Sequence, residues 1–165
     1  MAWELPENAP RNTGEAFEYV GRLGAGATID DLKILALTEA LGQELYYGLA
    51  AQVANPEVQA LLRRNGDEEL AHAHRLGEAL EILTGEAFPI PPIAENPIYT
   101  PLESSPVTKA SLTQLAELEF AGQDLYAGIA ASFDNPAAIA LFRQNGVEEV
   151  EHGHRLKQAS ALLDA

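Results

Sequence analysis

Apolar residues recur at a helical period of about 3.6 from residue 28 to about residue 53. The stretch begins at Thr28-Ile-Asp-Asp31, which resembles a capping box. It ends at Asn55-Pro56, where asparagine can cap the next helix and proline suits its first turn. A second helix is predicted from about residue 56 to residue 83, before Gly85. The tight turn between the two helices predicts an antiparallel hairpin over residues 28–84.

The segments on either side of this hairpin are broken by proline and glycine. Residues 1–27 are predicted to be an N-terminal extension with one short helix over residues 14–23 that covers an apolar surface. Trp3 is expected to dock on this chain or on a partner. Residues 85–107 contain six of the ten prolines, which excludes a helix or a central strand. Extended, this segment reaches about 70 Å, whereas a helix of about 25 residues spans about 38 Å.

The hairpin is repeated after an offset of 80 residues, because residues 32–84 match residues 112–164 at about half of the positions. Such self-similarity indicates two copies of one supersecondary unit. We therefore predict an all-α fold, in which residues 28–165 form a four-helix bundle of two tandem hairpins, 28–84 and 108–164. The long proline-rich crossover 85–107 joins them. A pseudo-two-fold axis would make the first and third long helices antiparallel neighbours, and likewise the second and fourth.

Four glycines lie inside the predicted helices, where each costs about 1 kcal/mol relative to alanine. They are Gly42, Gly48, Gly122 and Gly128, at matching positions of the two copies. We expect them to permit a close approach of the first and third long helices.

Composition narrows the classes of function. The net charge of −15, from 25 acidic and 10 basic residues, argues against a nucleic-acid partner and against an anionic membrane surface. The absence of cysteine excludes disulfides, iron–sulfur clusters and cysteine metal sites. The chain has no apolar run of the ~18 residues that a membrane span needs. It also opens without a signal-like segment, so a cytoplasmic location is expected.

The inward faces carry acids and histidines at repeated positions. Glu-x-x-His occurs once in each copy and places a carboxylate and an imidazole on one helix face. The six candidate metal ligands are Glu39, Glu69, His72, Glu119, Glu149 and His152. The pseudo-two-fold would bring them together at mid-bundle, where four buried carboxylates require either raised pKa values or compensating cations. Two divalent ions would supply four positive charges, so we predict a two-metal site.

Four motifs carry a resemblance to a known family: Glu39-(x6)-Tyr46, Glu69-x-x-His72, Glu119-(x6)-Tyr126 and Glu149-x-x-His152. Over about residues 28–164 the chain resembles the ferritin-like di-iron carboxylate superfamily, most closely its rubrerythrin and bacterioferritin branch. The resemblance implies that Glu69 and Glu149 bridge two metals, that Glu39 and His72 complete one, and that Glu119 and His152 complete the other. It implies two iron ions, with manganese or zinc as alternatives.

The same resemblance implies a non-haem di-iron oxidoreductase, either a rubrerythrin-like peroxidase or a ferroxidase, that reacts with O2 or H2O2. Rubrerythrins carry a cysteine-rich rubredoxin domain, which is absent here, so an external electron donor is expected. Their additional third-helix glutamate is also absent, because Ala116 occupies that position. The alternatives are a non-catalytic iron-binding or storage module and a metal-stabilised interaction bundle. We expect a homo-oligomer, a dimer or larger.

Two further acids stand one residue before the bridging glutamates. Glu68 is predicted to pair with His152 and Glu148 with His72, because ligand histidines commonly donate their second N–H to a carboxylate.

Tyr46 and Tyr126 are predicted to hydrogen-bond ligand carboxylates. Glu44 and Asp124 form another acidic pair in register, placed either beside the ligands or at the surface. The repeated residues expected at the surface are His74, Arg75, His154 and Arg155.

Overall fold

The chain is all-helical in a computed structural model that describes residue 3, residues 5–102 and residues 105–163. The helices are α1 (Thr13–Val20), α2 (Ile29–Ala51), α3 (Pro56–Thr84), α4 (Lys109–Ala130) and α5 (Pro136–Leu162), with one 3-10 turn, η1 (Ile93–Glu95). The described residues contain no strand, so the all-α prediction is confirmed. The short N-terminal helix ends three residues earlier than expected, and the predicted ends of the last helix and domain at 164 and 165 lie outside the described residues.

Side-chain caps begin the long helices at the residues that the sequence indicates. Thr28 accepts a hydrogen bond from the backbone N–H of Asp31 and Asp31 returns the contact, which completes a capping box. Thr108 begins α4 in the same way. Asn55 and Asn135 each cap the helix that follows, with proline in its first turn. Each cap satisfies backbone donors that a helix start would otherwise leave unpaired.

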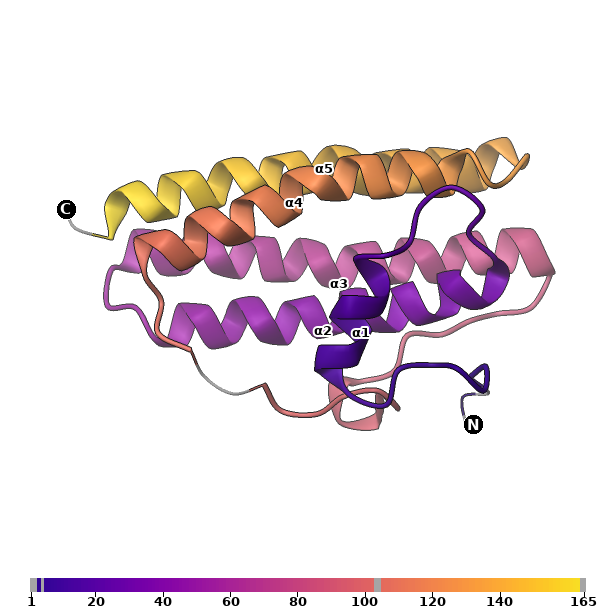
Figure 1. Cartoon of the computed structure of the whole chain (residues 1–165), viewed down its shortest axis with the longest axis horizontal. Coiled ribbons are helices and arrows are strands. Elements are labelled where there is room, and N and C mark those ends of the chain that lie inside the picture. The colour runs from indigo at the N-terminus through magenta and orange to yellow at the C-terminus, as the bar shows by residue number, and fades with distance from the viewer. Residues whose placement is uncertain (1–2, 4, 103–104, 164–165) are drawn as a thin grey trace.

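The four long helices lie side by side, and the described residues of the crossover, 85–102 and 105–108, return along their length (Figure 1). The crossover is not wholly extended, because η1 forms one helical turn within it. Helix α2 packs on α3, α4 packs on α5, and α3 packs on α5. Helices α2 and α4, which the sequence predicted to be close neighbours, do not pack closely over the described residues.

The helix-interior glycines do not serve the α2–α4 contact that we expected. A Cβ on Gly42 would lie 2.9 Å from the side chain of Glu69, and one on Gly122 would lie 2.9 Å from that of Glu149. Gly128 faces the backbone of residues 24–25, whereas a Cβ on Gly48 would meet nothing within 4 Å. Gly42 and Gly122 therefore make room for the candidate ligand glutamates, not for a neighbouring helix.

Helix α1 and the crossover cover one side of α2. Leu37 and Leu41 are buried with Ala16 of α1 and Ile98 of the crossover. The two covering segments are also tied together, since Thr13 and Thr100 exchange three hydrogen bonds between backbone and hydroxyl groups. The prediction that the N-terminal extension covers an apolar surface is confirmed. Trp3 docks on this chain, with its ring centroid 5.2 Å from that of Phe88.

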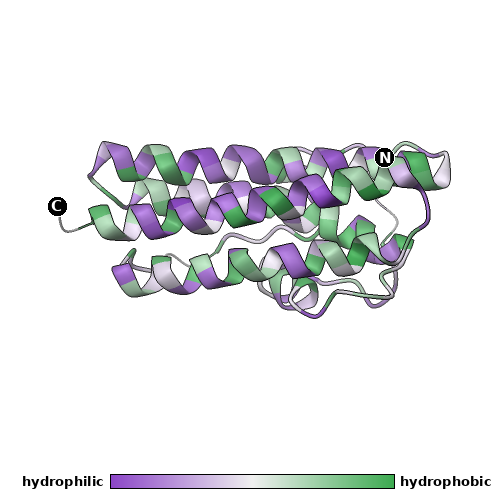
Figure 2. Cartoon of the chain, turned by 90° about the horizontal axis from the view of Figure 1, so that it is seen from above, coloured by the Kyte–Doolittle hydropathy of each residue, from purple (hydrophilic) through white to green (hydrophobic). Residues whose placement is uncertain are grey.

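Each long helix carries both polar and apolar residues around its axis (Figure 2). Two apolar clusters fill the interior, one containing Leu35, Leu76 and Phe142 and the other containing Leu62 and Leu156. The candidate ligands occupy the helical turns between these clusters. No helix in the described part of the chain combines the length and apolar character needed to cross a membrane.

Two glycine substitutions should separate packing from helix propensity. Gly77→Ala is expected to destabilise the protein by ~1–3 kcal/mol, because its Cβ would lie 2.7 Å from the backbone oxygen of Phe88. Gly48→Ala is expected to stabilise it by up to ~1 kcal/mol, because the site is open and alanine favours the helix. Urea denaturation of both variants measures the difference. Equal effects would contradict the placement of the crossover against α3.

Candidate metal centre

All six candidate ligands meet at the middle of the long helices. Helix α2 contributes Glu39, α4 contributes Glu119, and α3 and α5 each contribute a Glu-x-x-His pair. Their ligand atoms form two groups, each with all atoms within 4.8 Å of one another. One group is Glu39, Glu69, His72 and Glu149, and the other is Glu69, Glu119, Glu149 and His152. The two groups share Glu69 and Glu149, one from each copy of the repeat.

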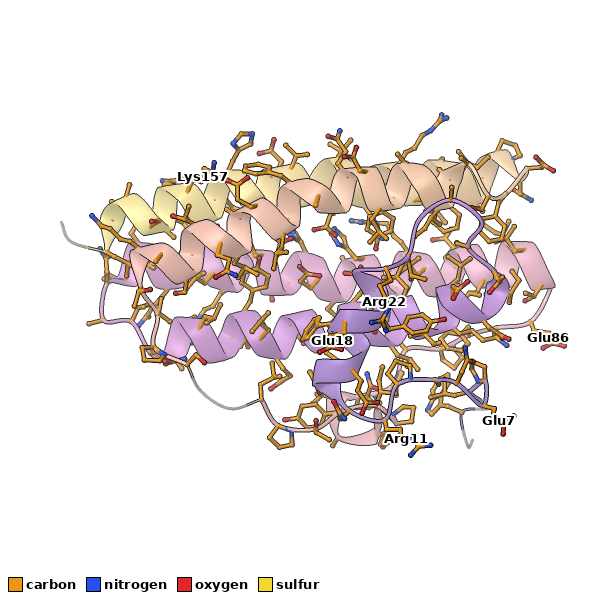
Figure 3. All side chains as sticks on the ribbon, in the orientation of Figure 1. Glu7, Arg11, Glu18, Arg22, Glu86 and Lys157 are labelled. Atoms are coloured by element: carbon orange, nitrogen blue, oxygen red, sulfur yellow. The ribbon has the colours of Figure 1, made fainter. Side chains whose placement is uncertain are left out.

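The position of this cluster is unusual for charged side chains. Other charged residues, such as Glu86 and Lys157, lie on the outside of the molecule (Figure 3). Both histidines of the cluster are 0% exposed, and the most accessible of the four glutamate side chains, Glu119, is only 10% exposed. Burying ionised carboxylates without compensation is costly, so the cluster requires a bound proton or cation.

The histidine Nδ1 atoms point at carboxylate oxygens without forming hydrogen bonds. His72 Nδ1 lies 3.2 Å from Glu149, 3.6 Å from Glu39 and 3.9 Å from Glu69. Yet this nitrogen is buried and has no hydrogen-bond partner, and the same is true of His152 Nδ1. Buried polar atoms are rarely left unpaired. A nitrogen lone pair that converges with carboxylate oxygens is a donor set suited to a metal ion.

The outer nitrogen of each ring contacts the acid that the sequence indicated. His72 Nε2 lies 3.1 Å from Glu148, and His152 Nε2 lies 3.1 Å from Glu68. When Nε2–H donates to the carboxylate, the neutral ring carries its lone pair on Nδ1, which faces the cluster. The two imidazole rings are stacked, with centroids 5.1 Å apart and planes 13° from parallel, so the two halves of the site are in direct contact.

Two arginines that we expected at the surface instead hold these outer acids. Arg155 is 8% exposed and donates to both Asn65 and Glu68. Arg75 makes the equivalent contacts to Asn145 and Glu148. The prediction of solvated arginines is therefore wrong. Each arginine lies three residues after a ligand histidine, one helical turn further on the same face, and that spacing was the available signal.

The two asparagines join the halves of the site. Asn65 donates to the backbone oxygen of His152, and Asn145 donates to that of His72. The sequence by itself assigned no role to this pair. Both asparagines stand four residues before the glutamate of a Glu-x-x-His motif, and this recurrence was the signal that could have identified them. The partner of each, however, lies on the other copy of the repeat. Only the packing of α3 on α5 identifies these contacts.

The tyrosines bond ligand carboxylates, as expected, and the structure shows that each bond crosses from one copy of the repeat to the other. Tyr126 OH donates to Glu39 over 2.7 Å, and Tyr46 OH donates to Glu119. Burial, together with the nearby carboxylates, raises the pKa of both phenols well above the usual value, so both remain donors. His74 and His154 are exposed, as predicted, and Glu44 and Asp124 are exposed as well.

The pKa values of the carboxylates shift in different directions, depending on what surrounds each group. Burial raises the pKa of Glu69 well above its usual value and raises that of Glu119 to about 8. The pKa of Glu149 is lowered: burial opposes this, but the contacts with His152 and His72 outweigh it. Burial is likewise outweighed at Glu68 and Glu148, where the histidine and arginine partners lower the pKa to about 2. The inner carboxylates therefore compete for protons, while the outer two stay ionised.

In comparisons with protein-family models, curated proteins and solved structures, no match to this chain was found. The residues of the site therefore carry the functional argument by themselves.

The metal-free protein should lose stability as the pH rises from 5 to 8. The pKa of Glu119 is raised from 4.5 to about 8 on folding, so across this range the folded protein holds a proton that the unfolded chain has lost, and the resulting stabilisation falls as the pH rises. The raised pKa values of His72 and His152 act in the same direction above pH 6.5, where the unfolded rings are already neutral. Thermal unfolding with a chelator present measures the trend.

Glu119→Gln should reduce this pH dependence, because the amide neither binds nor releases a proton, while the contributions of His72 and His152 remain. A metal-free protein that melts at a higher temperature at pH 8 than at pH 5.5 would contradict the proposed proton balance.

Proposed function

We propose that this chain is a di-iron carboxylate protein with a ferritin-like four-helix bundle, acting as an oxidoreductase on O2 or H2O2. The supporting observation is the pair of overlapping donor sets, which share Glu69 and Glu149 and contain two buried, unpartnered imidazole nitrogens. One shared pair of carboxylates between two complete sets fits two ions and not one. Manganese is the alternative metal, and zinc would fill the site without redox chemistry.

The residues present fit such a metal pair in charge and in donor type. Glu39 and His72 would hold one ion, Glu119 and His152 the other, and Glu69 and Glu149 would lie between them. The four negative charges of the carboxylates balance the four positive charges of two divalent cations. With these cations bound, the carboxylates would no longer compete for protons. Bound iron would supply one-electron oxidation and reduction, chemistry that no side chain in this cluster provides.

The surrounding residues orient the donors. Glu68 and Glu148 fix the tautomer of each histidine, and Arg155 and Arg75 keep these acids ionised. The tyrosines each donate to one outer glutamate oxygen, which orients that carboxylate. The apolar clusters on either side close the site along the helix axes.

Anaerobic titration with Fe(II) followed by H2O2 or O2 tests the proposal. We expect two Fe(II) ions per chain, rapid appearance of a ferric absorption band, and repeated turnover when a small-molecule reductant replaces the external electron donor. A single stoichiometric oxidation with retention of the iron would instead assign the chain to the iron-binding modules. Failure to bind iron beyond trace levels would contradict both functions.

Removal of the two shared carboxylates should abolish binding of the metal pair. In Glu69→Ala with Glu149→Ala, each ion would lose two ligands, so neither set remains complete. The matched control is Glu78→Ala with Glu151→Ala, which removes the same charge from exposed positions of the same helices. Metal analysis after gel filtration should give two ions per chain in the control. Two ions in the double ligand variant would show that the ligand assignment is wrong.

The buried arginine should matter more than an exposed arginine on the same acid. Arg155→Met is expected to weaken metal affinity about 10–100-fold, because Glu68 would lose the partner that holds it against His152. Arg64 also contacts Glu68, over 3.1 Å, but its side chain is 66% exposed. Arg64→Met is expected to change the affinity by less than about threefold. Competition with a chromophoric chelator measures both. Equal losses would contradict a positioning role for Arg155.

A further inference from the structure

A large cavity lies between α2 and α4, where close helix packing was expected, and residues of α1 and the crossover, such as Phe17 and Tyr99, complete its lining. Its volume is about 1040 Å³. Leucines from both helices form much of its wall: Leu41, Leu45, Leu49, Leu115, Leu118 and Leu125. Leu118 is 64% exposed, which is unusual for a leucine beside so much apolar surface.

The four inner carboxylates form the deep part of this cavity. Glu39, Glu69, Glu119 and Glu149 all line it, whereas neither histidine of the cluster does. The imidazole side of the cluster is closed by α3 and α5, which pack together. A molecule in the cavity would therefore approach the metal centre from its carboxylate side, between the two apolar clusters.

The size and lining of the cavity fit something larger than O2 or H2O2. Binding pockets for organic molecules have volumes of roughly 300–1,000 Å³, with apolar walls and few polar groups. A diatomic molecule or a peroxide needs only a small fraction of this space. The leucine wall favours a flexible hydrocarbon chain, because burying its methylene groups contributes about 0.8 kcal/mol each.

The charges around the cavity restrict the head group of such a molecule. Among the described residues that line it, none is basic. Glu44 and Asp124 are exposed lining residues on α2 and α4, where an occupant's polar end would meet solvent. An anionic head group would be repelled by both, while a neutral or cationic head group would not.

We propose that this cavity binds an aliphatic molecule with a neutral or cationic head group, with its chain along the leucine wall and its far end against the carboxylate cluster. This assigns a substrate class to the site, and it rests on the metal centre proposed above. Metal binding neutralises the four inner carboxylates, so the hydrocarbon chain binds more tightly to the loaded protein than to the metal-free protein.

Zinc-loaded protein provides a redox-silent test with three probes of equal chain length. Decan-1-ol and decylamine are expected to bind saturably at one molecule per chain by isothermal titration calorimetry. Decanoate is expected to bind at least tenfold more weakly. Methyl NMR spectra should show shifts of the cavity leucines, such as Leu45 and Leu115, with leucines outside the cavity, such as Leu80, unchanged.

Gly48 offers a variant that fills the cavity without touching a candidate ligand. It lines the cavity, and an added Cβ would meet nothing within 4 Å. Gly48→Phe is expected to reduce decan-1-ol affinity at least tenfold while two zinc ions remain bound. Gly48→Ala is the matched control and should keep the affinity within about threefold, since a methyl group fills little of the space.

The outcomes separate this inference from the proposed function. Two bound zinc ions without saturable decan-1-ol binding would overturn the cavity assignment alone. Equal affinity in Gly48→Phe, or decanoate binding as tightly as decylamine, would also overturn it. Leucine shifts that follow protein concentration instead of decan-1-ol would show that a second copy of the chain covers the cavity. Failure to retain zinc would overturn the metal centre and this inference together.

Discussion

The burial of four carboxylates against two imidazoles is the constraint on which the rest of this structure depends. Burial raises the pKa of Glu69 and Glu119, so these carboxyl groups hold protons unless cations balance their charge. A pair of divalent cations satisfies the same charge without that competition. The unpartnered Nδ1 atoms of His72 and His152 show that the cluster, without a cation, leaves donor atoms unused.

The repeat provides each half of the site with support from the other half. Arg155 on α5 holds Glu68 on α3, and Glu68 contacts His152 on α5. In the other half of the site, Arg75 on α3 holds Glu148 on α5. Because every such contact crosses from one copy to the other, neither hairpin can form the site alone. Assembly of the donor set is therefore coupled to the packing of α3 on α5.

The two copies differ in what covers their first helix. Helix α1 and the crossover bury Leu37 and Leu41 of α2, while Leu118 on α4 remains exposed. The pseudo-symmetry of the sequence is thus broken by segments outside the repeat. Residues of α1 and the crossover, such as Phe17 and Tyr99, also line the cavity beside the carboxylates.

Sequence alone determined the helices and the candidate donors. Helical periodicity and capping residues are local signals, and the repeat is found by comparing the chain with itself. Thr28, Asn55 and the two Glu-x-x-His motifs could be placed without knowledge of distant contacts. Tertiary structure decided what local patterns cannot encode. Arg155 is buried because its partner acid comes from the other copy, and Gly42 makes room for a glutamate instead of a helix. The separation of α2 from α4 likewise depends on how whole helices pack, which no spacing along one chain segment specifies.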